Sequence, residues 1–69
     1  MPEVPIRGDM IRLGQLLKLT GVVDAGGDVK AFLAANRVTV NGEPEDRRGR
    51  QLRAGDEVQV RGDVLRVVG

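Results

Sequence analysis

The 69-residue sequence contains no cysteine, histidine, serine, tyrosine or tryptophan, and its only side-chain hydroxyl groups are those of Thr20 and Thr39. Without cysteine, the chain can form neither a disulfide framework nor a thiolate metal site. Without histidine as well, a zinc ion has almost no ligands to use, and a serine or cysteine nucleophile with a histidine base cannot be built. A chain this short also has little volume for an enclosed pocket. We therefore expect no enzyme activity, no metal, no cofactor and no small-molecule substrate.

Long apolar runs are also missing. No stretch approaches the ~18 residues that a membrane-spanning helix needs, and the first residues lack the pattern of a signal peptide. We therefore expect a cytoplasmic protein without a membrane partner. The sequence is 41% hydrophobic, with 11 basic and 10 acidic residues, and this balance favours a folded chain over a disordered one. The length predicts one small domain over residues 1–69.

Apolar spacing predicts two helices in the first half of the chain. Leucines over residues 12–20 recur with the period of an amphipathic helix, and Gly21 is a typical stop. The same period returns over residues 28–35, where it places Phe32 on the core-facing side. Asn36 then suits the end of the second helix, because asparagine tolerates the left-handed conformation.

The second half alternates with a period of two and predicts strands. The edge strand is expected over residues 3–7, and further strands over residues 38–40, 58–60 and 64–68. Asn41-Gly42 is a strong hairpin signal, whereas residues 43–50 are polar and read as a loop. The expected fold class is α+β, with a two-helix, helix-turn-helix-like unit packed on a small, mostly antiparallel β-sheet.

A net charge of +1 conceals a local excess of arginine. Four of the seven residues from Arg47 to Arg53 are arginine, the side chain best suited to bidentate contact with phosphate. Taken alone, such a run is more often a solvated loop, and the acidic residues just before it favour that interpretation. Gly26-Gly27 is a second candidate, because N–H groups at a helix start attract anions and Lys18 and Lys30 are placed to face it.

The segment from Arg12 to Gly42 resembles the RNA-binding domain named after small-subunit ribosomal protein four, the S-four domain. Family members begin with R-L-x-x-x-L, matched by Arg12-Leu13 and Leu17, and run to V-x-V-N-G, matched by residues 38–42. A later L-x-x-G-D-x-V matches residues 52–58, so the core motif covers about residues 11–61. Short stand-alone bacterial members are similar almost end to end, sharing G-G before the second helix and V-N-G-E-x-E-x-R-R-G.

The resemblance implies a fold of two helices and a hairpin (the alpha-L motif) whose RNA surface is formed by both helices and the hairpin. Transferred residue by residue, that surface comprises Arg12, Lys18, Gly27, Lys30, Arg37 and Asn41. The loop arginines Arg47, Arg48 and Arg50 are added on charge alone. Ala25-Gly26 stands where many members have Ser-Arg, which removes one basic residue from the expected surface.

These observations predict a non-catalytic protein that binds structured RNA, ribosomal or transfer RNA, through phosphate contacts and shape, with the ribosome or a subunit as a further partner. The single aromatic residue argues against base stacking on a single strand. One alternative is a protein-interaction module of a ribosome or RNA-processing complex, which the near-neutral charge keeps open. Another is a sulfur carrier of the β-grasp kind, although such proteins end in Gly-Gly and this chain ends in Val68-Gly69.

Overall fold

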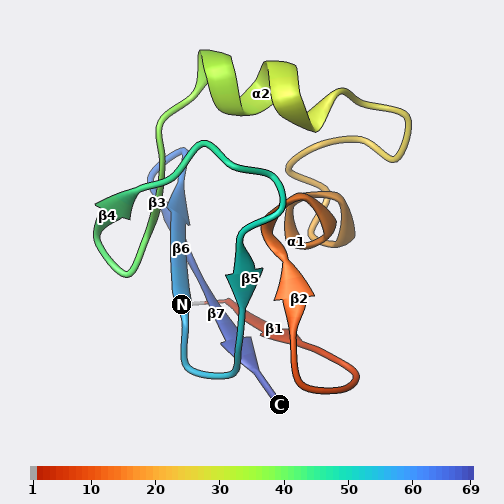
Figure 1. The fold of residues 1–69 in the computed structure, drawn as a ribbon, viewed down its shortest axis with the longest axis vertical. Helices are drawn as coiled ribbons and strands as arrows, with labels where there is room; N and C mark the ends of the chain where they lie inside the picture. Colours follow the sequence, from red (N-terminus) through yellow and green to blue (C-terminus); the bar gives the residue numbers. More distant parts are fainter. Residues whose placement is uncertain (1) are drawn as a thin grey trace.

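The computed structural model describes residues 2–69 and combines two short helices with seven short strands (Figure 1). The helices are α1 (Leu13–Leu19) and α2 (Val29–Ala35). The strands are β1 (Glu3–Pro5), β2 (Ile11–Arg12), β3 (Val38–Val40), β4 (Glu43–Pro44), β5 (Gln51–Leu52), β6 (Glu57–Val60) and β7 (Asp63–Val68). The expected α+β class, with two helices on a mostly antiparallel sheet, is confirmed.

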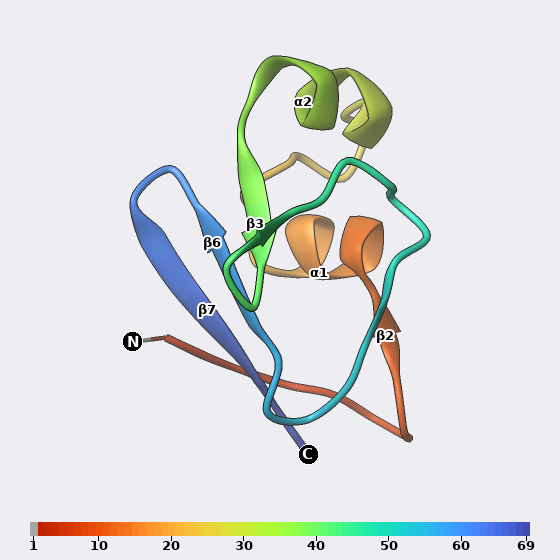
Figure 2. The ribbon, with the colours of Figure 1, turned by 60° about the vertical axis from the view of Figure 1, so that its left-hand side comes forward.

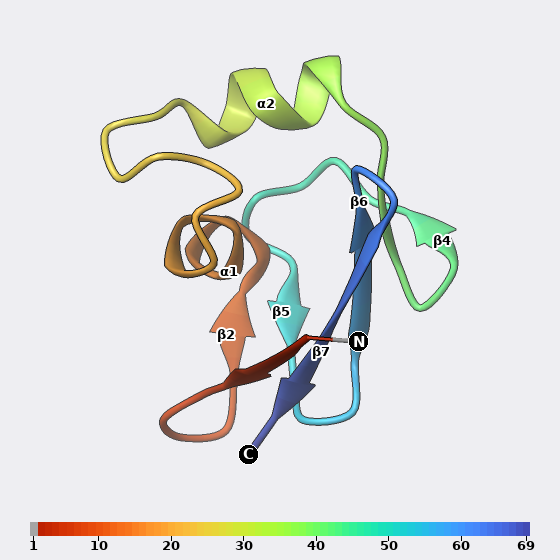
Figure 3. The same cartoon turned by 180° about the vertical axis from the view of Figure 1, so that it is seen from behind.

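Five strands form the main sheet in the order β1-β7-β6-β3-β4. The β3, β4, β6 and β7 pairs are antiparallel, and β1 joins β7 in parallel as an edge strand, with Val4 opposite Val67. Figure 3 shows β1 crossing beside β7, at the end of the molecule away from α2. The edge strand with its prolines is therefore found where the sequence predicts it, because proline is tolerated at a sheet edge.

The core is built from leucines of α1 and valines of the sheet. The side chains of Leu13, Leu16 and Leu17 are fully buried, and the paired valines of β3 and β6 face them from the sheet. Figure 2 shows α1 between α2 and the lower strands, which makes it the central helix. α2 contributes less, because Val29 and Leu33 are its only buried residues.

One expectation for α2 holds and one needs correction. Phe32 packs against the core as expected, although it is only partly buried, and the Arg61 guanidinium lies 5.0 Å from the centroid of its ring. Asn36 ends the helix in an extended conformation (φ −129°, ψ 140°) and not a left-handed one. It ends the helix with its side chain instead, since Nδ2 donates to the Phe32 carbonyl at 3.0 Å. Gly21, by contrast, has the expected positive φ of 79°.

The sequence did not predict three strands of two residues each. β4 follows the Asn41-Gly42 turn and pairs with β3, so the polar segment 43–50 begins as a strand. β2 and β5 form a separate small sheet, with Ile11 opposite Leu52. Strands this short carry no measurable alternation. No helix in residues 2–69 is long and apolar enough to cross a membrane.

Candidate nucleic-acid interface

A groove of about 740 Å³ lies where the starts of α1 and α2 meet the loop between β4 and β5. Its charged lining residues are Arg12, Lys18 and Arg48, with Asp28 as the one acid. Gly14, Gln15, Gly27, Val29 and Gly49 complete the lining. We call this surface the α1 groove. It brings together four of the residues that the sequence predicts for RNA contact, namely Arg12, Lys18, Gly27 and Arg48.

Backbone hydrogen bonds hold the loop against the start of α1. The N–H groups of Leu13 and Gly14 donate to the carbonyls of Arg50 and Arg48, each at 2.9 Å. A Cβ on Gly14 would lie 3.4 Å from both the Cβ and the carbonyl oxygen of Arg48. The loop thus accepts hydrogen bonds from N–H groups that a helix start leaves without intrahelical partners, and the backbone of Arg48 is fixed relative to α1.

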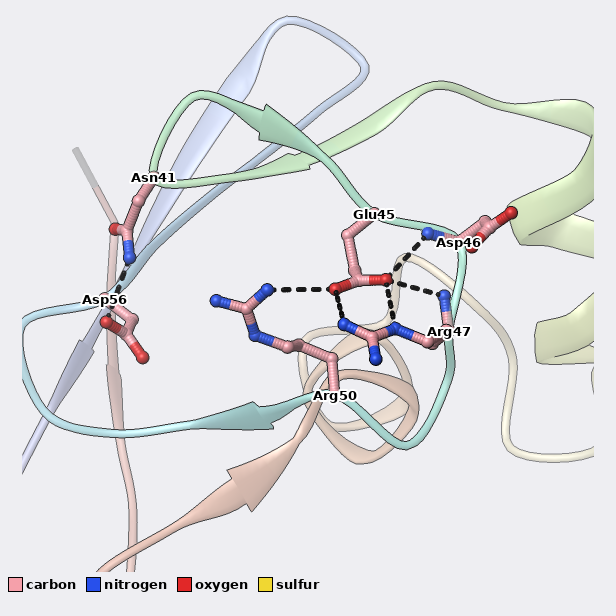
Figure 4. Close-up of polar contacts among 6 residues, drawn as sticks. All are labelled: Asn41, Glu45, Asp46, Arg47, Arg50 and Asp56. Carbon is pink, nitrogen blue, oxygen red and sulfur yellow. Dashed lines mark hydrogen bonds and ion pairs between the residues drawn. The ribbon is translucent and has the colours of Figure 1, made fainter.

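The loop is organised around Glu45, whose side chain is 5% exposed (Figure 4). Arg47 donates from Nε to Oε2 at 3.0 Å and from Nη2 to Oε1 at 3.1 Å, and Arg50 Nη1 donates to Oε1 at 2.9 Å. The backbone N–H groups of Asp46 and Arg47 each donate to Oε2 at 3.1 Å. The carboxylate is therefore paired with two guanidinium groups and two amides.

This environment changes the protonation of Glu45. The net effect is a pKa lowered from 4.5 to about 2, and the largest cause is the hydrogen bonding from the Arg47 guanidinium. Burial acts in the opposite direction, while the Arg47 N–H and the Arg50 guanidinium lower the pKa further. Glu45 is consequently ionised near neutral pH and serves as the anionic centre of the loop.

The three loop arginines, which the sequence treats as equivalent, play different roles. Arg47 and Arg50 are ion-paired with Glu45, whereas Arg48 forms no ion pair within residues 2–69. The full charge of Arg48 is thus available to a ligand in the α1 groove. The acidic residues before the arginines, which suggest a solvated loop when only the sequence is considered, include the partner of two of these arginines. The E-x-R spacing of Glu45 and Arg47 is the sequence signal for this pairing.

The remaining predicted residues lie outside the α1 groove. Lys30 is exposed on α2, and Arg37 follows the end of α2 and lines a different groove. Asn41 uses both polar atoms inside the protein. Its Nδ2 donates to Asp56 Oδ1 at 3.1 Å (Figure 4), and its Oδ1 accepts from the Glu57 N–H at 3.0 Å. Asn41 therefore ties the β3–β4 hairpin to the segment before β6.

The start of α2 already holds a negative charge. The Asp28 carboxylate accepts from the Ala31 N–H at 3.1 Å, and the Gly27 N–H donates to the Asp24 carbonyl at 2.7 Å. A carboxylate at this place disfavours the anion that the Gly26-Gly27 step was expected to attract. The contribution of Gly27 to the α1 groove is therefore its small size.

Gly27→Ala is expected to destabilise the protein by about 1–2 kcal/mol, and Gly26→Ala is the matched control. A Cβ at Gly27 would lie 2.7 Å from Val23 Cγ1 and 3.0 Å from the Asp24 carbonyl oxygen, but at Gly26 it would meet nothing within 4 Å. Urea unfolding followed by circular dichroism measures the free energy of unfolding of both variants. Equal midpoints for the two variants would contradict the close packing at Gly27.

Two comparisons with known proteins give matches to this chain. The S4 domain family matches residues 4–68. The chain is 49% identical over 59 residues to the probable ribosome maturation protein RlbA of Bacillus subtilis (strain 168), an alignment that covers 86% of this chain and 83% of that protein. No solved structure matches the chain. The family match extends past the expected core motif to include most of β1 and all of β7.

Proposed function

This chain belongs to the S4 domain family, and from that premise we propose that it is a non-catalytic protein that binds structured RNA by its phosphate backbone. The observation that carries the proposal is the α1 groove. Its cations Arg12, Lys18 and Arg48 form no ion pair among the described residues. Gly14, Gly27 and Gly49 leave the wall without bulky side chains, so that a phosphate can approach both charge and backbone.

Specificity then comes from the shape of the RNA. Phosphate contacts position a protein on nucleic acid but carry no sequence information directly, and structured RNA is recognised largely by backbone geometry. Phe32, the one aromatic residue, packs partly against the core and has the Arg61 guanidinium over its ring, so the chain offers no series of free aromatic rings for base stacking. The relative's name refers to ribosome maturation, which favours ribosomal RNA over transfer RNA and a cytoplasmic, ribosome-associated protein.

Binding to a structured ribosomal RNA fragment tests the proposal. The groove cations with Lys30 and Arg37 allow about five phosphate contacts, so a plot of log affinity against log salt should have a slope between about −3.5 and −4.5. Fluorescence anisotropy of labelled RNA measures this slope, with duplex DNA as competitor. A slope steeper than this range would show that further cations of the chain also contact phosphate.

Absence of RNA binding at low salt would contradict the proposal. The protein-interaction alternative would then be preferred, because Glu45 already neutralises part of the basic loop.

A further inference from the structure

A second cationic groove lies at the end of α2, where the turn between β6 and β7 meets the start of β3. Its lining includes Arg37, Thr39, Gln59 and Arg61 and contains no acidic residue. None of its lining residues belongs to the α1 groove. Arg37 and Arg61 form no ion pair in the part of the chain that the structure describes. The two grooves are therefore separate basic surfaces.

Arg61 has a backbone conformation that is unusual for arginine. Its φ is 53° and that of the following Gly62 is 80°, the geometry of a tight hairpin turn that favours asparagine or glycine at the first position. The other such turn in this chain, Asn41-Gly42, has the preferred residues with φ values of 52° and 85°. Arginine does not improve the turn, so its presence is better explained by its side chain.

The Arg61 side chain is directed onto α2. Its guanidinium lies 5.0 Å from the centroid of the Phe32 ring, within the range of a cation–π interaction. This contact holds the charge beside the end of α2, on the groove that Arg37 also lines. Two guanidinium groups without a carboxylate in the same groove form a surface suited to a phosphate group.

The floor of the groove has polar groups of its own. Thr39 and Gln59 are opposite each other in the β3–β6 register, and both line the groove. The Thr39 hydroxyl is covered from solvent and has no hydrogen-bond partner among residues 2–69. Because this hydroxyl is covered, Thr39 and Gln59 add polar lining to the groove, while the two arginines supply the groups that contact a ligand.

Building on the proposed function, we infer that Arg37 and Arg61 form a second phosphate-binding site, which contacts the RNA backbone on a different face from the α1 groove. The protein then holds RNA at two places, one beside α1 and one beyond the end of α2. The contribution of Arg37 to RNA binding, expected from the sequence, is made here and not in the α1 groove.

The test compares Arg37→Gln/Arg61→Asn with Arg7→Gln/Arg53→Gln. The first variant removes both cations of the groove, and asparagine at position 61 suits the turn, so the fold should be retained. The second removes two exposed arginines from loops at the opposite end of the molecule (Figure 1). We expect the groove variant to bind the same ribosomal RNA fragment about tenfold more weakly, with a salt slope about 1.5 less steep. The Arg7→Gln/Arg53→Gln variant should have the same RNA affinity and the same salt slope as the unaltered protein.

The result distinguishes this inference from the function on which it rests. If the unaltered protein binds RNA and both double variants have the same affinity and slope, the second site is overturned and the proposed function stands. If the unaltered protein does not bind RNA, both are overturned. Thermal unfolding of each variant checks that a variant with weaker RNA binding is still folded.

Discussion

Replacing Glu45 with glutamine should lower the free energy of unfolding by about 2 kcal/mol, because it removes the anion that two guanidinium groups and two amides surround. The value is smaller than for a fully buried pair, since the Arg47 side chain is 72% exposed and solvent screens its charge. For a domain of this size, such a loss corresponds to a fall in melting temperature of about 10 °C.

Glu43→Gln is the matched control for this substitution. Glu43 is an exposed acid in β4, two residues before Glu45, and forms no ion pair within residues 2–69. Its substitution should change the unfolding midpoint by only a few tenths of a kcal/mol. Thermal unfolding of both variants makes the comparison, and equal melting temperatures would rule out the organising role of Glu45.

Acid should reproduce the effect of the Glu45→Gln variant. The folded-state pKa of Glu45, about 2, lies below its ordinary value of 4.5, so the folded protein binds this proton less readily than the unfolded chain. The stabilisation is therefore complete above about pH 4.5 and is lost as the pH falls toward 2. The unaltered protein should lose more stability across this range than the glutamine variant. Parallel profiles of stability against pH would show that another group is responsible.

Loss of the three cations of the α1 groove should weaken RNA binding about a hundredfold at low salt. The variant is Arg12→Gln/Lys18→Gln/Arg48→Gln, and its salt slope should be less steep than that of the unaltered protein by about 2–2.7. All three side chains line one groove and form no ion pair in the described part of the chain. Their substitution should therefore remove phosphate contacts and leave the melting temperature nearly unchanged. Anisotropy and thermal unfolding measure the two effects.

Two adjacent arginines provide the sharpest control for the α1 groove. Arg48→Gln should reduce the salt slope by about one and spare stability, since this side chain lines the groove and has no ion pair. Arg47→Gln should lower the melting temperature and change the salt slope little, since Arg47 pairs with Glu45. The opposite pattern would mean that the loop presents Arg47, and not Arg48, to RNA.

The parts of the fold that the sequence predicted are those with strong local signals. The leucine period of α1, the valine alternation of β3 and β6 and the Asn41-Gly42 turn each lie within a few residues, and the structure has all three. The β2–β5 pair depends instead on contacts between distant segments. Two residues are too few for any period to show, so no local pattern could have indicated it.

The candidate site was predictable in composition but not in arrangement. Basic residues could be counted in the sequence, but which of them are neutralised depends on the fold. Glu45 pairs with Arg50 at the other end of the same loop. Asn41, in the turn between β3 and β4, pairs with Asp56, which comes just before β6. Such pairings arise from three-dimensional proximity, and sequence spacing alone left Arg47, Arg48 and Arg50 indistinguishable.

The hydrogen bonds between the start of α1 and the β4–β5 loop have a consequence for the order of folding. The N–H groups of Leu13 and Gly14 donate to the carbonyls of Arg50 and Arg48. In the sequence, these two residues come after α2 and the β3–β4 hairpin. A chain emerging from the ribosome can wind α1 early, but it cannot complete the helix start until the later loop has been synthesised. Contacts so distant in sequence slow the search for the native state. The α1 groove therefore cannot be complete in a nascent chain until the β4–β5 loop has been synthesised.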